Sequence, residues 1–200
     1  MQTRASLILT GAALAAFAIA AAGMQPATPP STDPSTDRPA QPGPDDPFAD
    51  VNALIATVYP TAGYTCKGTV RFIKQGEAVR VLADIEGLAP NSKHGFHIHE
   101  FGDASKPDGS SAGGHYNPEH HDHALPTEQT RHAGDLGNLE ANADGRVRLD
   151  MVTHNISLTG EHNPIIGRGV IIHADPDDGG QPTGNAGSRI GIGVIGIAQH

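Results

Sequence analysis

The sequence predicts an all-β domain built as a sandwich or a barrel. The chain contains 25 Gly and 16 Pro, a composition that favours frequent turns over long helices. Short apolar segments recur roughly every ten residues between turn signals, which is typical of short strands in a sandwich or barrel. No segment keeps a helical period over three turns. Since Trp is absent and aromatic residues make up 4% of the chain, the core must consist mainly of Val, Ile, Leu and Ala.

The N-terminal segment has the pattern of an export signal. Arg4 precedes a run rich in Ala, Leu and Ile, and residues 18–20 and 20–22 both match an A-x-A cleavage motif. We predict that residues 1–23 are a signal peptide and that the mature protein is periplasmic or extracellular. An uncleaved membrane anchor is the alternative, although the run is short and Ala-rich for a membrane span.

A proline-rich segment follows and separates the signal from the domain. Residues 24–50 hold eight of the 16 Pro and few apolar residues. Such a composition cannot bury enough apolar surface to offset the entropy lost on ordering. We predict a disordered linker over 24–50 and a single folded domain over 51–200.

Eight strands are expected in the domain. They are 53–59, 65–73, 78–85, a strand around His97 and His99, 137–141, 146–153, a strand ending at His173, and 190–198. A loop from Gly102 to about Gly134 interrupts this series. Loops of this length are uncommon in compact domains and are usually functional or disordered. The histidine content of this loop favours function.

The segment around His97 and His99 is expected to present both imidazoles together. Side chains alternate between the two faces of a strand, so His97 and His99 share one face. Phe96, Ile98 and Phe101 are then expected to pack in the core. Two imidazoles on one strand face can reach the same small cation.

Further metal-binding side chains cluster downstream. Seven of the 12 His lie between positions 97 and 132, which is difficult to explain as a set of isolated surface residues. The downstream candidates are His115, His120, His121, His123, His132, Asp135 and His173. Imidazole and carboxylate groups in this density indicate a site for transition metals.

Charge and cysteine content exclude some classes of function. The formal net charge is −9, which disfavours nucleic-acid binding because such binding depends on Lys and Arg. A small anionic substrate remains compatible, because the local field decides its attraction. Cys66 is the only cysteine, so an internal disulfide cannot form. We expect a buried thiol; an intermolecular disulfide is the alternative.

Several motifs in the same order resemble one family. They are residues 95–103, 113–118, 131–138, 184–189 and 193–199. On these motifs, residues 51–199 resemble the Cu/Zn superoxide dismutase family. The resemblance implies an eight-stranded antiparallel Greek-key barrel with long metal-binding loops.

The resemblance also implies two metal ions. The residues it assigns to copper are His97, His99, His115 and His173. The residues it assigns to zinc are His115, His123, His132 and Asp135. His115 would then bridge both metals as an imidazolate. A shifted register, with His120 or His121 in place of His123, is the alternative.

Two further residues receive roles from the resemblance. Asp177 is expected to link a copper-binding His to a zinc-binding His, since metal-bound imidazoles usually donate their second N–H to a carboxylate or carbonyl. Asp175 and Asp178 are the alternatives for this role. Arg189 is expected to guide an anionic substrate to the copper; a structural Arg that bonds backbone carbonyls is the alternative, and one residue can do both.

The activity that the resemblance implies is the conversion of superoxide to oxygen and hydrogen peroxide. Copper would alternate between Cu(II) and Cu(I), zinc would be structural, and His115 and Arg189 would act in catalysis. A metal carrier without enzymatic activity and an inactive scaffold are the rival interpretations. A carrier needs no anion guide, so Arg189 favours the enzyme.

The chain departs from the family pattern in two places. The family's disulfide would join the loop near Gly109 to the last strand near Ile192, and neither residue is Cys. We hypothesise that zinc and local packing hold the loop instead. The segment between His173 and Arg189 is shorter than in many relatives and lacks Lys, so electrostatic steering is expected to be weaker. The family is often dimeric, which makes a homodimer one expected assembly, but the missing disulfide leaves the oligomeric state open.

Overall fold

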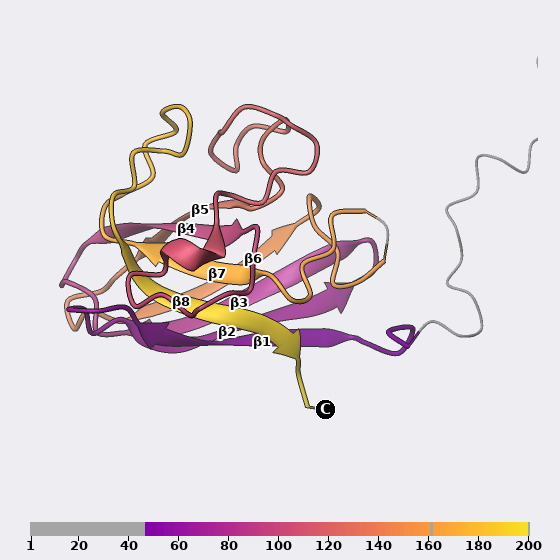
Figure 1. Ribbon diagram of the computed structural model, residues 1–200, viewed down its shortest axis with the longest axis horizontal. Coiled ribbons are helices and arrows are strands. Elements are labelled where there is room, and N and C mark those ends of the chain that lie inside the picture. Colours follow the sequence, from indigo (N-terminus) through magenta and orange to yellow (C-terminus); the bar gives the residue numbers. More distant parts are fainter. Residues whose placement is uncertain (1–46, 161, 200) are drawn as a thin grey trace, which may run out of the picture. The chain divides into compact units, whose positions relative to one another are not determined.

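The computed structural model describes residues 47–160 and 162–199, which form an antiparallel β-barrel (Figure 1). The strands are β1 (Ala53–Pro60), β2 (Lys67–Gln75), β3 (Ala78–Glu86), β4 (Lys93–His99), β5 (Asp135–Glu140), β6 (Val147–Thr153), β7 (Gly169–His173) and β8 (Arg189–Ile197). The expected strands are therefore confirmed, with ends displaced by a few residues. The signal peptide and most of the linker lie outside the described residues, so these boundaries stay predictions.

The strand order confirms the Greek-key prediction. Neighbouring strands follow the order β5-β4-β7-β8-β1-β2-β3-β6, and each neighbouring pair is antiparallel. The connections from β3 to β4 and from β6 to β7 cross between distant places in this order. Because β4 and β7 are neighbours, residues far apart in the sequence are brought side by side.

Alternating side chains build the core. In β1, Leu54, Ala56 and Val58 are at most 1% exposed, while Tyr59 faces outward and is 65% exposed. This period of two is the reason that β1 has one apolar face toward the barrel interior. In the described part of the chain, the core is mainly aliphatic, as the composition predicts.

Strand β4 is buried on both faces. Phe96 and Ile98 are 0% exposed and pack in the barrel core, whereas His97 and His99 are at most 1% exposed on the opposite face. The prediction that Phe101 packs in the core is wrong, because this side chain is 57% exposed. Strand β4 ends at His99, so the alternation on which that prediction depends no longer applies two residues later.

Two long segments cover the outer face of β4. They are residues 102–134, which contain the short 3₁₀ turn η2 (Ser110–Ala112), and residues 174–188. Figure 1 shows both extending from the side of the barrel that carries β4 and β5. In the ranges described, no helix is long and apolar enough to cross a membrane.

Cys66 is buried, as expected, and its ionisation should affect stability at high pH. The side chain is 1% exposed, and burial raises the pKa of its thiol to about 12. An unfolded thiol ionises near pH 8.5. We therefore expect the free energy of unfolding to fall as pH rises from about 9 toward 12, because the unfolded chain releases a proton that the folded chain keeps. Chemical denaturation of the wild type and of Cys66→Ala tests this, and equal slopes against pH in the two proteins would contradict it.

Candidate metal centre

Strands β4 and β7 supply three histidines. His97 and His99 lie on one face of β4, and His173 is the last residue of the antiparallel neighbour β7. The ring centroid of His173 is 5.0 Å from that of His97 and 5.5 Å from that of His99. Three imidazoles from two neighbouring strands thus surround one small volume.

His115 reaches the same place from the long loop. An antiparallel bridge pairs it with His99, and the N–H of Tyr116 donates to the carbonyl of Ile98 at 2.9 Å. Gly134 supports this pairing, since its N–H donates to Tyr116 and its carbonyl accepts from the N–H of Ile98. A Cβ on Gly134 would lie 2.2 Å from the carbonyl oxygen of Ile98. The backbone can therefore approach this closely only with glycine at position 134.

Asp135, the first residue of β5, gathers three loop histidines. Its Oδ1 lies 2.9 Å from His115 Nδ1 and 3.2 Å from His132 Nδ1, and its Oδ2 lies 2.9 Å from His123 Nδ1. All four residues are at most 7% exposed. A buried carboxylate thus faces three imidazole nitrogens in a volume closed to solvent.

In the part of the chain that the structure describes, two groups of four side chains place donor atoms within 4.8 Å of one another. The first donor group is His97, His99, His115 and His173. The second donor group is His115, His123, His132 and Asp135. His115 belongs to both. Because its Nδ1 faces Asp135, Nε2 is the nitrogen that remains for the first group.

Two buried nitrogens indicate that cations belong in these groups. His97 Nδ1 and His123 Nδ1 are buried and have no hydrogen-bond partner. His123 Nδ1 is close to Asp135 Oδ2, but the pair lacks hydrogen-bond geometry. A buried polar atom without a partner costs about 1–3 kcal/mol. One such nitrogen lies in each group, and a bound cation would give each of them a partner.

The donor chemistry fits copper in the first group and zinc in the second. Four imidazoles suit copper, and three imidazoles with one carboxylate suit a closed zinc site. The ring nitrogens that face away from the first group have backbone partners. His99 Nδ1 lies 3.0 Å from the carbonyl oxygen of Gly113, and His173 Nδ1 lies 3.2 Å from that of Gly187. These hydrogen bonds fix the ring orientation and leave Nε2 of each ring toward the group.

Asp177 lies between the two donor groups. Its Oδ2 is 2.9 Å from His97 Nε2, and its Oδ1 is 2.9 Å from His123 Nε2. The side-chain amide of Asn138 in β5 holds the main chain of Asp177, since it donates to the carbonyl at 2.8 Å and accepts from the N–H at 2.7 Å. Asp177 is 3% exposed.

The two alternatives to Asp177 are not placed for this role. Asp175 and Asp178 are exposed. The carboxylate of Asp178 instead accepts hydrogen bonds from the N–H of Gly180 and from the amide of Asn185. Of the three acidic residues after β7, Asp177 alone is both buried and in contact with donor-group histidines.

His120 and His121 lie outside both donor groups. His120 is exposed, and His121 is partly exposed with its Nδ1 3.2 Å from the carbonyl oxygen of Arg131. His123, by contrast, is buried against Asp135 and Asp177. The geometry therefore favours His123 over the shifted register.

Burial keeps most imidazoles of the first group neutral. It is the largest cause that lowers the pKa of His99 well below its usual value, that of His115 to about 4 and that of His173 to about 3. The charges of neighbouring imidazoles lower these pKa values further. Neutral imidazole is the form that binds metal, so these residues are ready to coordinate at neutral pH.

The second group holds a proton where a cation would bind. Burial lowers the pKa of His123, but the carboxylates of Asp135 and Asp177 outweigh it and raise the pKa to about 9. Burial opposes ionisation of Asp135, yet the close approach of His115, His123 and His132 to its carboxylate depresses its pKa well below the usual range. The positive charge that these carboxylates attract in the metal-free protein is one that a divalent cation can replace.

Arg189, the first residue of β8, approaches the first donor group. Its two amino groups donate to the carbonyl oxygens of Gly109 and Gly113, each at 2.5 Å. Its charge is a minor cause of the lowered pKa values of His99 and His173. The structural role of Arg189 as a carbonyl-binding residue is therefore present, and its role as an anion guide stays a prediction.

Local packing and Arg189 hold the loop where the sequence lacks a disulfide. Ala112 in η2 is 0% exposed and packs with Ile171 and Ile192 in a small apolar cluster. The bond from Arg189 to Gly109 ties the same stretch to β8. The packing part of the hypothesis thus has a structural basis, and the contribution of zinc stays a prediction.

Removal of the metals is expected to lower the melting temperature by about 10 °C or more. A ligand present at a thousandfold its Kd stabilises the folded state by about 4 kcal/mol. For a domain of this size, 1 kcal/mol shifts the melting temperature by about 2–4 °C. Differential scanning calorimetry of metal-loaded and chelator-treated protein measures the shift. Similar melting temperatures for the two forms would refute the idea that zinc anchors the loop.

His94 supports the centre, although the sequence does not single it out. It is 4% exposed, its Nδ1 lies 2.7 Å from the carbonyl oxygen of His173, and its Nε2 lies 2.6 Å from Ser92 Oγ. Its position near the start of a strand is equally typical of a surface histidine. The contact with His173 depends on the pairing of β4 with β7, which local sequence does not encode.

Comparisons with known proteins agree with the geometry. A family model described as copper/zinc superoxide dismutase (SODC) matches residues 66–195. A Cu-Zn superoxide dismutase of Paramecium bursaria Chlorella virus 1 is 48% identical over 142 residues, which cover 67% of this chain and 74% of that protein. The crystal structure of the clock protein EA4 is similar with a TM-score of 0.67 and 42% identity, over 74% of this chain and 95% of that chain. The matched residues include both donor groups, and the chain therefore belongs to the copper/zinc superoxide dismutase family.

Proposed function

We propose that this chain is a superoxide dismutase whose copper and zinc share one imidazole. The proposed copper ligands are the first donor group, and the proposed zinc ligands are the second. The single observation that carries this proposal is the membership of His115 in both groups. When bound, copper supplies the one-electron chemistry that turns superoxide into oxygen and hydrogen peroxide.

The residues of the chain attract the substrate, orient the metal-binding imidazoles and provide a nitrogen for proton transfer. Arg189 attracts the superoxide anion toward the first donor group, because its guanidinium lies close enough to influence His99 and His173. His115 Nε2 is the atom that would accept and return a proton, since its Nδ1 is occupied at Asp135. Asp177 orients His97 and His123 together. Burial of both donor groups excludes bulk water from the ring nitrogens.

The rival function of a metal carrier explains fewer observations. A carrier requires the donor groups but has no use for a cation beside the first of them. Arg189 is half-buried, and burial lowers the pKa of its guanidinium. Keeping a partly desolvated cation near this group serves the attraction of an anion, which favours the enzyme.

Metal content and superoxide consumption, measured on the same preparation, test the proposal. We expect one copper and one zinc per chain after loading, and activity that follows copper. His115→Ala is expected to lower both zinc affinity and activity, whereas His154→Ala, at an exposed His, should leave both unchanged. Full metal loading without superoxide consumption would favour the carrier.

We further propose that the protein is exported. The support is the pattern of residues 1–23, namely Arg4, an apolar run and small residues at the expected cleavage site. Mass spectrometry of protein secreted from a host that expresses the full chain tests this. A product that retains residues 1–23 in a membrane fraction would favour the anchor.

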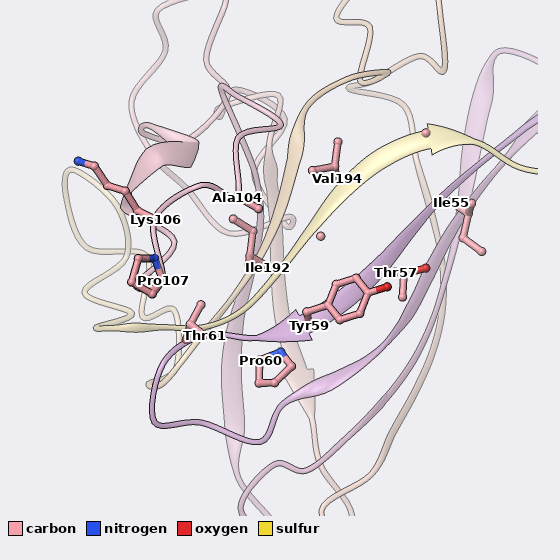
Figure 2. Close-up of a pocket in the computed structure, with 12 residues that line it drawn as sticks. Ile55, Thr57, Tyr59, Pro60, Thr61, Ala104, Lys106, Pro107, Ile192 and Val194 are labelled. Atoms are coloured by element: carbon pink, nitrogen blue, oxygen red, sulfur yellow. The ribbon is translucent and has the colours of Figure 1, made fainter.

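We also propose that a second copy of the chain covers the outer face of β1 and β8. Tyr59 and Val194 are 65% and 44% exposed on this face. Figure 2 shows the adjacent pocket, whose lining includes Tyr59, Val194 and Lys106 of the long loop. The lining contains no donor-group histidine. Exposed apolar surface of this kind is typical of protein interfaces.

A charge placed on this face should separate the copies. Val194→Lys is expected to sediment as a monomer if the wild type sediments as a dimer. Val152→Lys is the matched control, because Val152 in β6 is exposed to a similar extent, 46%. A monomeric wild type, or a dimer that survives Val194→Lys, would exclude this interface.

A further inference from the structure

We infer that Gln181 is a positioning residue for the zinc group and acts by holding the main chain of His123. Its Nε2 donates to the carbonyl oxygen of His123 at 2.6 Å, and its Oε1 accepts from the N–H of His123 at 3.2 Å. One side-chain amide thus satisfies both main-chain polar groups of a residue 58 positions away. The inference rests on the proposed role of His123 as a zinc ligand.

This clamp complements the contact that Asp177 makes with the ring. Asp177 holds His123 Nε2 at 2.9 Å, which restrains the ring and makes no contact with the main-chain N–H or carbonyl of His123. Gln181 restrains that main chain from the same segment, four residues later. With both ends of His123 held, Nδ1 is kept toward Asp135 and His132. A metal site gains affinity when its ligands are held in the bound geometry before the ion arrives.

The segment that carries Gln181 is itself well ordered by hydrogen bonds. The N–H of Gly184 donates to the carbonyl of Gly180 at 2.6 Å, and the N–H of Asp178 donates to the carbonyl of Gly184 at 3.0 Å. Gly184 lies directly over the ring contact, since a Cβ there would come 2.1 Å from Asp177 Oδ1. This short closed turn presents Gln181 to His123. The segment after β7 therefore contributes directly to the zinc group.

The expected effect is moderate, because Gln181 is exposed and its amide can bond water instead. Partners of metal ligands typically change metal affinity by about 10–100-fold. For an exposed partner we expect the lower end of this range. Gln181→Met keeps the shape of the side chain and removes both hydrogen bonds. Thr183→Val is the matched control, an exposed residue in the same turn.

The experiment follows metal release from the metal-loaded full chain. Zinc release to excess chelator is expected to be about tenfold faster in Gln181→Met than in the wild type and in Thr183→Val. Co(II) bound in the zinc group provides a second signal, and its visible absorption bands should shift in Gln181→Met alone. A release rate within about twofold of the wild type, or an unchanged Co(II) spectrum, would overturn the inference. A wild type that binds no zinc would instead refute the ligand assignment, and the role of Gln181 with it.

Discussion

Replacement of Asp177 by Ala is expected to weaken zinc binding by about 100-fold and to lower copper retention as well. The carboxylate contacts His97 in the first donor group and His123 in the second, each at 2.9 Å. Its removal leaves two buried ring nitrogens without a partner, and each costs about 1–3 kcal/mol. A single partner of a metal ligand typically changes affinity by about 10–100-fold, and Asp177 serves both groups.

Asp175→Ala is the control for this effect. Asp175 is an exposed carboxylate two residues earlier in the same segment, so its removal changes the net charge equally. Metal affinity is measured by competition with a chelator of known Kd, followed by elemental analysis. Equal zinc affinities in the two variants would show that the position of the Asp177 carboxylate is unimportant.

Arg189→Ala is expected to reduce kcat/KM for superoxide by about tenfold or more at low salt, with copper and zinc content unchanged. A cation beside a site raises the rate at which an anion reaches it, and added salt screens this attraction. We therefore expect the rate of the wild type to fall as salt is added, and the rate of Arg189→Ala to depend less on salt. Stopped-flow measurement of superoxide decay over a range of ionic strength provides kcat/KM at low salt and its dependence on salt for both proteins.

Two further variants separate attraction from loop support. Arg189→Lys keeps the charge but cannot reach two carbonyl oxygens in the manner of a planar guanidinium. It should retain most of the rate and still melt at a lower temperature than the wild type. Arg80→Ala removes one charge at an exposed pair with Asp150 and should leave the rate unchanged. If Arg189→Lys loses as much rate as Arg189→Ala, loop support rather than charge accounts for the effect.

The strands and the histidines of the site could be predicted from local sequence. In β4, the alternation of Phe96, His97 and Ile98 assigns opposite faces to neighbouring residues, and the structure follows that assignment. The same reasoning fails for Phe101, because the strand has ended at His99. Periodicity predicts where side chains point only as long as the regular backbone continues.

Contacts between distant segments could not be predicted from the local sequence pattern. Asp175, Asp177 and Asp178 are chemically equivalent as residues. The family resemblance favoured Asp177, and the approach of its carboxylate to His97 and His123 is the structural observation that distinguishes it. Gln181 carries no signal either, since a glutamine in a polar turn is usually solvated.

The sequence by itself determined the all-β class, the strand positions and, through its resemblance to a family, the candidate ligands. The tertiary structure alone revealed that His94 and Gln181 support those ligands, and it distinguished Asp177 from Asp175 and Asp178. The physical reason is the distance along the sequence between the residues that interact. Strand patterns arise from the backbone of neighbouring residues, whereas a hydrogen bond across 58 or 80 positions exists only after the barrel has closed.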